Sequence, residues 1–304
     1  MDTFHYSEHF RGLVVNFLRR KEASPHLNDL LGGPNSRVIR FIKQLIPEIE
    51  YHCGTLNGKR ILDFGCGMGA SSAALTHYGG KVCAFDIDEK SIEICKQRIQ
   101  EHGMKDRVQF YCADDIDKVK DSMGNFDLIL MNGVIEHIPL SIIGLRKRII
   151  KSLFALLNKG GYLFINDSPN RLYPIDFHTT KLWLIPWTMA GSEWAYRRAI
   201  KKGRFSNDPT NMECSLVRTG QFSLEEYGAW GITYWEIIHY LSKEDFTCVN
   251  LINGHNRHIS VFSLSRNWKR TFFEFLIYYS AVKLFNIPIT AFGPSINNLV
   301  LQKC

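Results

Sequence analysis

The sequence predicts an α/β protein with a doubly wound, mainly parallel sheet and helices on both faces. Two observations lead to this prediction. Strand-like and helix-like patterns alternate at intervals of about 20 to 30 residues between residues 57 and 167, as in sheets built from strand-helix-strand units. In addition, the apolar run 61–64 leads directly into glycines at 65, 67 and 69. Ligands of such sheets bind where the strands end.

The glycine turn indicates a nucleoside ligand, and its details favour a cationic one. Similar turns seat the pyrophosphate of dinucleotides at a helix N-terminus. Here, however, the spacing is G-x-G-x-G rather than G-x-G-x-x-G, and Asp63 stands two residues before the first glycine. A carboxylate at that place would repel a diphosphate and attract an ammonium or sulfonium group. The predicted cofactor is therefore a positively charged nucleoside.

The segment D-F-G-C-G-M-G at 63–69 resembles the first motif of the class I S-adenosylmethionine-dependent methyltransferases. Later segments resemble that family's strands in the same order, at 81–86, 107–115, 126–138 and 157–167. The resemblance implies a Rossmann-like, mainly parallel sheet of the family's seven-stranded type. It also implies S-adenosyl-L-methionine as the cofactor and S-adenosyl-L-homocysteine as its product.

The resemblance implies cofactor-binding residues at the carboxyl ends of the first four strands. Asp86 would bond the ribose hydroxyls, and Asp114 would lie beside the adenine amino group, with Asp115 as the alternative. Asn132 and Gly133 would border the methionine part. The full expected set is Asp63, Gly65, Cys66, Gly67, Gly69, Asp86, Ile87, Asp114, Asp115, Asn132 and Gly133. Singly, an aspartate at a strand end is as often a helix cap or a turn residue.

The predicted organisation is one enlarged domain with additions. It comprises an N-terminal helical lid at 1–56, the cofactor-binding core at 57–167, a substrate-binding cap at 168–245, and a segment at 246–304 that completes the sheet and carries an apolar helix. Pro47 is expected to interrupt the helical pattern of the lid. The lid would cover the cofactor or simply pack against the sheet.

Two further elements are expected after the core. Residues 231–241 have a helical pattern with Ile232, Trp235 and Ile238 on one face, Leu241 as a further candidate for it, and would form part of the cap. Residues 295–302 resemble the family's closing strand, which forms an antiparallel edge.

The segment 168–187 is the expected wall of the acceptor pocket, because aromatic residues there alternate with polar groups and prolines. The candidate substrate-binding residues are Asn170, Arg171, Tyr173, Asp176 and Trp183. The pattern N-R-x-x-P-x-D-x-H resembles small-molecule methyltransferases of the broad group that includes the ubiquinone-biosynthesis O-methyltransferases. We expect a small-molecule acceptor, hydrophobic or aromatic, that is methylated on a hydroxyl oxygen.

Histidine is the expected general base, because its pKa suits proton transfer near neutral pH. His178 is preferred and His137 is the alternative; either imidazole could instead bond a loop carbonyl. Some relatives bind a divalent ion through E-x-x-E-H at the fourth motif, but Gly133 replaces the first glutamate. Glu136 and His137 alone fall short of the usual ligand number, and we expect no metal.

The formal charge of +7 is clustered, for example at 146–148 and 197–204. Such clusters are more often solvated faces than binding sites, and no nucleic-acid module accompanies them. Nucleic acid is therefore not an expected partner. An RNA methyltransferase and a cofactor-binding assembly protein without catalysis are the competing interpretations.

The eight cysteines include no C-x-x-C pair, which favours a reducing compartment. No basic segment followed by an apolar run opens the chain, and we expect a cytoplasmic protein. Residues 266–292 are strongly apolar but contain Glu274, Lys283 and Pro288. This segment is expected to pack against the cap or a second copy in a homodimer, or to contact a membrane surface peripherally.

Overall fold

The computed structural model describes most of the core and parts of the later segments. The described residues are 4–18, 25–139, 142–176, 182–187, 194, 197–198, 201–202, 230–242, 245–249, 280 and 284–304. His178 and most of 188–229 and 250–283 lie outside them.

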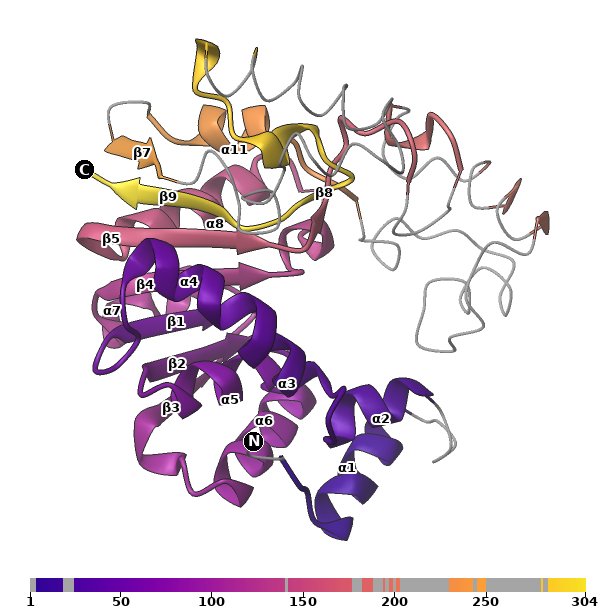
Figure 1. Ribbon diagram of the computed structural model, residues 1–304, viewed down its shortest axis with the longest axis vertical. Helices are drawn as coiled ribbons and strands as arrows, with labels where there is room; N and C mark the ends of the chain where they lie inside the picture. The colour runs from indigo at the N-terminus through magenta and orange to yellow at the C-terminus, as the bar shows by residue number, and fades with distance from the viewer. Residues whose placement is uncertain are drawn as a thin grey trace, which may run out of the picture.

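A seven-stranded sheet in the order β3-β2-β1-β4-β5-β9-β7 forms the centre of the molecule (Figure 1). Its first five strands are parallel, and β9 and β7 are antiparallel to their neighbours. The strands are β1 (Arg60–Phe64), β2 (Lys81–Asp86), β3 (Val108–Cys112), β4 (Phe126–Asn132), β5 (Leu157–Asn166), β7 (Phe246–Cys248) and β9 (Leu299–Lys303). The predicted fold class is confirmed.

Helices precede the sheet and connect its strands. They are α1 (Glu8–Leu18), α2 (Pro25–Leu31), α3 (Arg37–Arg40), α4 (Ile46–Cys53), α5 (Ala70–His77), α6 (Glu89–Glu101), α7 (Lys120–Met123), α8 (Leu145–Ala155) and α11 (Tyr234–Tyr240). Short 3-10 helices span Lys105–Arg107, Ile116–Lys118, Ile135–His137, Ile185–Trp187 and Ile289–Phe292. Asp88 caps α6 by accepting a hydrogen bond from Ser91 N, which satisfies one of the free N–H groups of its first turn.

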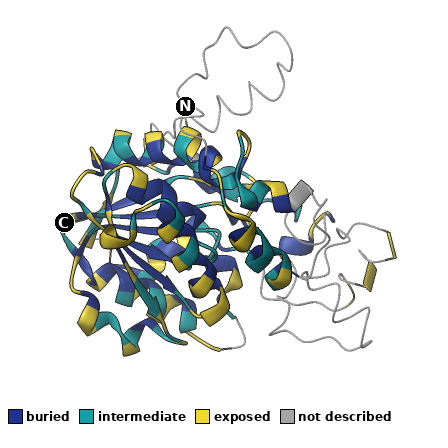
Figure 2. Cartoon of the chain, turned by 90° about the horizontal axis from the view of Figure 1, so that it is seen from below, coloured by how far each residue is buried: buried dark blue, intermediate teal, exposed yellow. Residues whose placement is uncertain are grey.

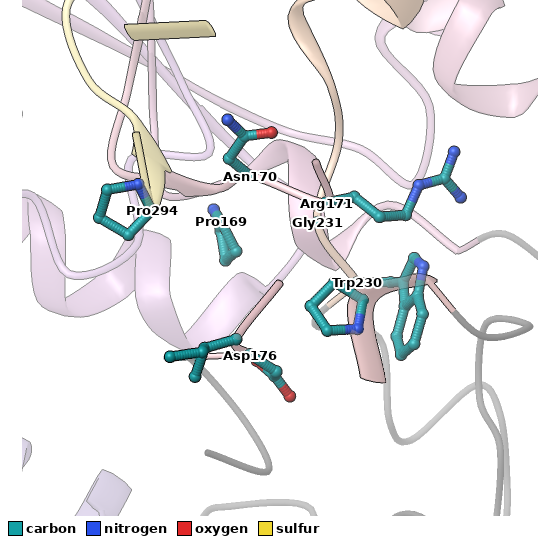
Figure 3. A pocket seen from close by; sticks show the side chains of 9 residues that line it. Pro169, Asn170, Arg171, Asp176, Trp230, Gly231 and Pro294 are labelled. Atoms are coloured by element: carbon teal, nitrogen blue, oxygen red, sulfur yellow. The ribbon is translucent and has the colours of Figure 1, made fainter. Parts of the chain in front are cut away.

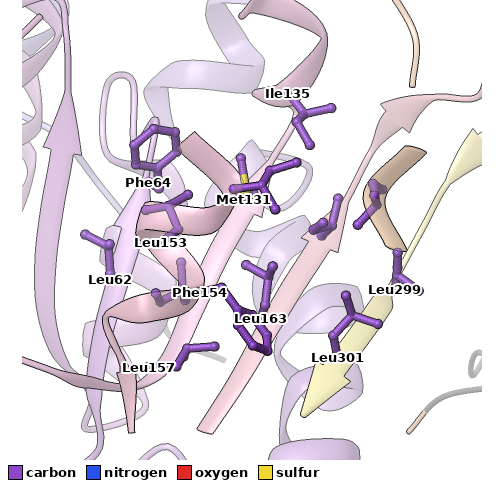
Figure 4. Packing of buried hydrophobic residues seen from close by; sticks show 14 of the residues in the cluster. Leu62, Phe64, Met131, Ile135, Leu153, Phe154, Leu157, Leu163, Leu299 and Leu301 are labelled. Atoms are coloured by element: carbon purple, nitrogen blue, oxygen red, sulfur yellow. The ribbon is translucent and has the colours of Figure 1, made fainter. Parts of the chain in front are cut away.

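The sheet is buried on both faces. Alternate residues of each strand point to opposite sides, and a separate cluster of apolar residues packs on each side. On one face, Leu62 and Phe64 of β1 pack in a cluster with Leu153 of α8 (Figure 4). On the other face, Ile61 of β1 packs in a cluster with Ala74 of α5. Figure 2 shows the buried residues concentrated in the strands and on the inner sides of the helices. Apolar runs without alternation are typical of such parallel strands.

The proline expected to interrupt the N-terminal helical pattern does so through a change of helix type. Residues Phe41–Leu45 form a π-helix, in which Ile46 N donates to Phe41 O. Pro47 follows in the first turn of α4, where its missing N–H is not needed. The wider turn thus absorbs the lost hydrogen bond without ending the helical run.

The prediction of one closing strand at 295–302 is wrong in two respects. The segment divides into β8 (Ser295–Ile296), which pairs with β6 (Ser168–Pro169), and β9, which pairs with β5. Asn298 separates them with a φ of 54°, a left-handed conformation that asparagine tolerates better than most residues. In addition, β9 lies inside the sheet, and β7 forms the edge.

The helix expected at 231–241 is present as α11, and its buried residues agree only in part with the predicted face. Thr233 and Glu236 form a capping box that sets the start of α11. Ile232 and Leu241 are buried as expected, and Tyr234 and Ile237 are buried in the same cluster as α8, whereas Trp235 is exposed. Ile232 lies before the start of α11 and is therefore not part of its face.

The buried central strands predict a large difference between two isoleucine substitutions. Ile129 in β4 is fully buried, and Ile143 is 98% exposed. We expect Ile129→Ala to lower the free energy of unfolding in urea by about 2 to 5 kcal/mol, because it leaves a cavity. Ile143→Ala should change it by less than about 0.5 kcal/mol. Equal effects of the two substitutions would contradict this description of the core.

Candidate functional site

The turn after β1 is joined to β2 by main-chain hydrogen bonds. Gly65 N and Cys66 N both donate to Phe85 O, at 2.8 and 2.9 Å. Gly67 N donates to Asp86 Oδ2 at 2.7 Å. The turn therefore depends on the carboxyl end of β2, where a nucleoside would have to bind.

The three glycines of this turn have positive φ angles of 73°, 51° and 79°, a region that side chains strain. A β-carbon on Gly65 would lie 2.5 Å from Val134 Cγ2, and one on Gly69 would lie 2.4 Å from Cys95 Sγ. A β-carbon on Gly67 would meet open space. Packing excludes a side chain at the outer glycines, and the middle glycine borders the space that a ligand can enter.

Asp63 does not face this space, contrary to the expectation of an acid that attracts a cationic ligand. Its side chain is 1% exposed and accepts hydrogen bonds from Ser71 Oγ at 2.7 Å and Ser72 Oγ at 2.6 Å. Burial raises the pKa of this carboxyl to about 6. Asp63 thus ties the end of β1 to the first turn of α5.

Asp86 and Ile87 lie at the end of β2 as predicted. Asp86 accepts from Gly67 N through Oδ2 and from Asp88 N through Oδ1 at 3.0 Å. Each carboxylate oxygen can accept a further bond, so ribose hydroxyls can still be bound. Ile87 is 69% exposed and offers an apolar surface beside the acid.

The two acids after β3 have different surroundings. Asp115 accepts from Arg148 Nη1 at 3.1 Å and from Asp117 N at 3.0 Å. Asp114 is exposed and forms an ion pair with Lys118 at 2.7 Å. Asp114 is therefore the more accessible of the two.

Asn132 and Gly133 form the end of β4 beside β5. Asn132 Oδ1 accepts from Asn166 Nδ2 at 2.7 Å, and Gly133 N donates to Asn166 O at 2.9 Å. Gly133 has a φ of 66°. These bonds hold the loop after β4 at the same edge of the sheet as the glycine turn.

Glu136 is a buried acid next to this loop. From the sequence, its only indicated role was that of a metal ligand. Its Oε2 accepts from Ser168 Oγ at 3.1 Å, and its Oε1 lies 3.9 Å from His137 Nε2. Burial raises the pKa of Glu136 to about 7. His137 itself is 58% exposed. The adjacent Glu136 and His137 are the only feature of the sequence that points to this buried carboxyl.

A nucleoside cofactor fits these residues. The carboxyl ends of β1, β2 and β4 bring together free space over Gly67, the remaining acceptor capacity of Asp86 and the exposed Ile87. The site is built almost entirely from main chain and one acid, as expected for a ligand held by its ribose. In the described ranges, no group of three or more histidine, cysteine or acidic residues could hold a metal ion.

A buried arginine holds the second wall of the site. Arg146 of α8 donates to the carbonyl oxygens of Ile138, Glu136, Trp230 and Gly231, at 2.8 to 3.3 Å. Burial lowers its pKa to about 10. Arg148 pairs with Asp115 at 2.7 Å. The expectation that the cluster at 146–148 is a solvated face is therefore wrong for Arg146, which joins the loop after β4 to residues 230–231.

The segment expected to bind the acceptor lines a small pocket together with Trp230 and Gly231 (Figure 3). Its walls are Pro169, Asn170, Arg171, Ile175, Asp176, Pro186, Trp230, Gly231 and Pro294. The cavity volume is about 20 Å³, enough for one water molecule. The buried indole nitrogen of Trp230 has no hydrogen-bond partner among the residues that the structure describes. The pocket is too small for a whole acceptor.

The predicted substrate-binding residues have different roles around this pocket. Asn170 uses its amide nitrogen to bond Ala291 O and Gly293 O, each at 2.8 Å. Arg171 pairs with Glu236 at 2.7 Å, and Figure 3 shows its guanidinium directed away from the pocket. Trp183 is exposed, and Tyr173 and Asp176 are half-buried. Asn170 thus supports the wall, and Asp176 remains the polar candidate that lines it.

The comparisons with known proteins agree with this site. Residues 56–206 match the model of a methyltransferase domain. The chain is 27% identical to a ubiquinone biosynthesis O-methyltransferase of Bordetella avium over 211 residues, covering 67% of this chain and 78% of the relative. It is 32% identical to one of Coxiella burnetii over 128 residues, covering 42% and 48%.

Among solved structures, magnesium protoporphyrin IX methyltransferase from Synechocystis is 20% identical, covers 53% of this chain and 70% of its own, and has a TM-score of 0.39. No helix in the part of the chain that the structure describes has the length and apolar character needed to cross a membrane. The domain match, the curated relatives and the sheet with its glycine turn lead to one conclusion: the chain belongs to the class I S-adenosylmethionine-dependent methyltransferases.

Proposed function

We propose that the protein transfers a methyl group from S-adenosyl-L-methionine to a hydroxyl oxygen of a small-molecule acceptor. One observation carries the proposal. The loop after β4, with Gly133, Glu136 and His137, lies between the glycine turn and the pocket of residues 169–176, and Glu136 bonds Ser168 directly. The relatives named above, ubiquinone biosynthesis O-methyltransferases, support transfer to oxygen.

In this proposal the cofactor is held by the glycine turn and the ends of β2, β3 and β4. Asp86 would accept the ribose hydroxyls, Ile87 would cover one adenine face, and Asp114 would lie at the adenine edge. Asn132 and Gly133 would border the methionine part. When bound, S-adenosylmethionine supplies a methyl group on a good leaving group, so the protein mainly has to align the acceptor oxygen with it.

A hydroxyl acceptor must also lose its proton, and two histidines are the proposed bases. His137 is exposed next to the loop after β4, and we include it on that ground. His178 lies outside the described residues, and its role remains the proposal taken from the sequence. Glu136 beside His137 would orient the imidazole and stabilise its charged form when it has accepted a proton.

The two arginines of the cluster at 146–148 give no support to the competing RNA methyltransferase. Arg146 is buried among carbonyl groups, and Arg148 is paired with Asp115. These cations are therefore not offered to a phosphate backbone. A small molecule remains the proposed acceptor.

The cofactor site can be tested without knowing the acceptor. Asp86→Ala removes the acceptor for Gly67 N and for the ribose, and we expect it to weaken S-adenosylhomocysteine binding at least about 30-fold in titration calorimetry. The control is Asp106→Ala, because Asp106 is an exposed acid in the 3-10 helix before β3. Unchanged affinity in the Asp86 variant would place the cofactor elsewhere.

The base can be identified once the acceptor is found by transfer of labelled methyl groups to fractions of small molecules, lipids and RNA. His137→Ala and His178→Ala should each be compared with the parent enzyme. Loss of the base should lower kcat about 100-fold while binding of S-adenosylhomocysteine stays unchanged. A variant that keeps normal turnover excludes its histidine as the base, and label that appears only in RNA would reject the proposed acceptor class.

The raised pKa of Glu136 predicts a pH effect on stability. The folded protein holds this proton up to a pKa of about 7, whereas an unfolded glutamate loses it near 4.5. Between these values the folded state binds more protons than the unfolded state, so Glu136 lowers stability as pH rises. Glu136→Gln should therefore gain stability relative to the parent from pH 5 to pH 8, by up to about 3 kcal/mol.

The measurement is urea unfolding of both proteins across that range. Glu89→Gln, at an exposed position in α6, is the matched control and should run parallel to the parent. Parallel curves for Glu136→Gln would show that this carboxyl titrates normally.

A further inference from the structure

Arg98 of α6 is fully buried and is bonded to three separate parts of the chain. Its Nε donates to Met68 O at 2.7 Å, Nη1 to Tyr6 Oη at 2.6 Å and Nη2 to Leu30 O at 3.0 Å. The guanidinium also lies over the rings of Tyr6 and Phe10, 4.8 and 4.9 Å from their centres. The hydrogen-bond acceptors are two carbonyls and a phenol, none of which carries a formal charge.

Burying a charge of this kind is costly unless its hydrogen bonds are complete. The fork of the guanidinium allows one side chain to satisfy acceptors in several directions. Here the three bonds lead to Tyr6, two residues before α1, to Leu30 in α2 and to the glycine turn. If one of these segments moves away, the charge loses a partner inside the protein, so the three positions depend on one another.

The partner in the turn is directly adjacent to the expected cofactor space. Met68 lies between Gly67 and Gly69, and its side chain packs against the cluster of Phe10, Val14, Leu18, Leu27, Leu30 and Ile94. This cluster joins α1 and α2 to α6. Figure 1 shows α1 and α2 beside α6, on the side toward which the parallel strands point. The N-terminal helices therefore contact the turn through both its side chain and its carbonyl.

We propose that Arg98 is a positioning residue that couples the N-terminal helices to the binding of the methyl donor. Arg98 holds the Met68 carbonyl, and thereby the turn whose amide at Gly67 bonds Asp86. The same side chain docks α1 and α2 against that turn. Donor binding and docking of these helices then stabilise each other, because both require the same arrangement of the turn. This coupling rests on the proposed cofactor site. It does not require Arg98 to contact the donor.

A buried arginine with a purely structural role makes a different prediction. Its loss would lower stability without a specific effect on donor affinity, and the donor would not alter the exchange of amides in α1. Coupling predicts both effects, and linkage requires them to be reciprocal.

Tyr6→Phe is the sharpest test, because it removes the oxygen that accepts from Arg98 and keeps the ring beneath the guanidinium. Tyr162→Phe is the matched control, because it also removes a half-buried phenol oxygen, which accepts from Gln302 Nε2 at 3.1 Å. Tyr162 lies in β5, which is separated from β2 by two strands of the sheet. The probes are S-adenosylhomocysteine affinity by calorimetry and hydrogen exchange of Glu8–Leu18 with and without this ligand, on the full chain.

We expect Tyr6→Phe to weaken S-adenosylhomocysteine binding about five- to tenfold and to reduce the protection that the ligand gives to α1. The Tyr162→Phe protein should behave as the parent in both measurements. Unchanged affinity in Tyr6→Phe, or no effect of the ligand on α1 exchange in the parent, would overturn the coupling.

Arg98→Lys gives a second reading if it folds, because the ammonium cannot reach three acceptors and should show the same losses. The Asp86→Ala variant separates the two proposals. If Asp86→Ala binds as the parent, the cofactor site itself is misplaced. If it loses binding and Tyr6→Phe does not, only the coupling fails.

Discussion

The structure depends on how polar groups are satisfied at the one edge of the sheet where the parallel strands end. Five parallel strands deliver their carboxyl ends and the following loops to this edge, and a buried loop must find partners for its polar atoms within the protein. Asp63, Asp86, Arg98 and Arg146 supply them. Asp86, Arg98 and Arg146 each bond groups from at least two segments of the chain, and Asp63 joins β1 to α5. The shape of the edge therefore follows from a few charged residues.

The two arginines hold two different parts of this edge. Arg98 holds the glycine turn against the N-terminal helices, on the side proposed to bind the methyl donor. Arg146 holds the loop after β4 against residues 230–231, on the side proposed to bind the acceptor. Both bond only neutral acceptors, and both replace solvent by oriented carbonyl groups. A methyl transfer that relies mainly on alignment benefits from such rigid walls, and Glu136 and His137 lie between them.

The fold and the glycine turn could largely be predicted, because their signals are local. Apolar runs predict buried parallel strands, and glycines 65 and 69 stand where packing excludes side chains. The roles of Asp63 and Arg146 could not be predicted in this way. An aspartate before a glycine turn has the same sequence pattern whether its side chain faces a ligand or two serines. A run of basic residues predicts a solvated surface, and the sequence does not show that the helix buries Arg146. The start of α11 differs from the expected one because the capping box of Thr233 and Glu236, and not the apolar spacing, sets the first residue of the helix.

The sequence by itself determined the class of sheet, the position of the glycine turn, and Asp86 and Ile87 at the end of the second strand. These features follow from steric and hydrophobic rules that act within a few residues. Only the tertiary structure decided that Asp63 is buried, that Glu136 is an acid with a raised pKa, and that Arg98 links the turn to Tyr6 and Leu30. Those properties depend on desolvation and on partners that lie up to 92 residues away along the chain, and no local pattern records them.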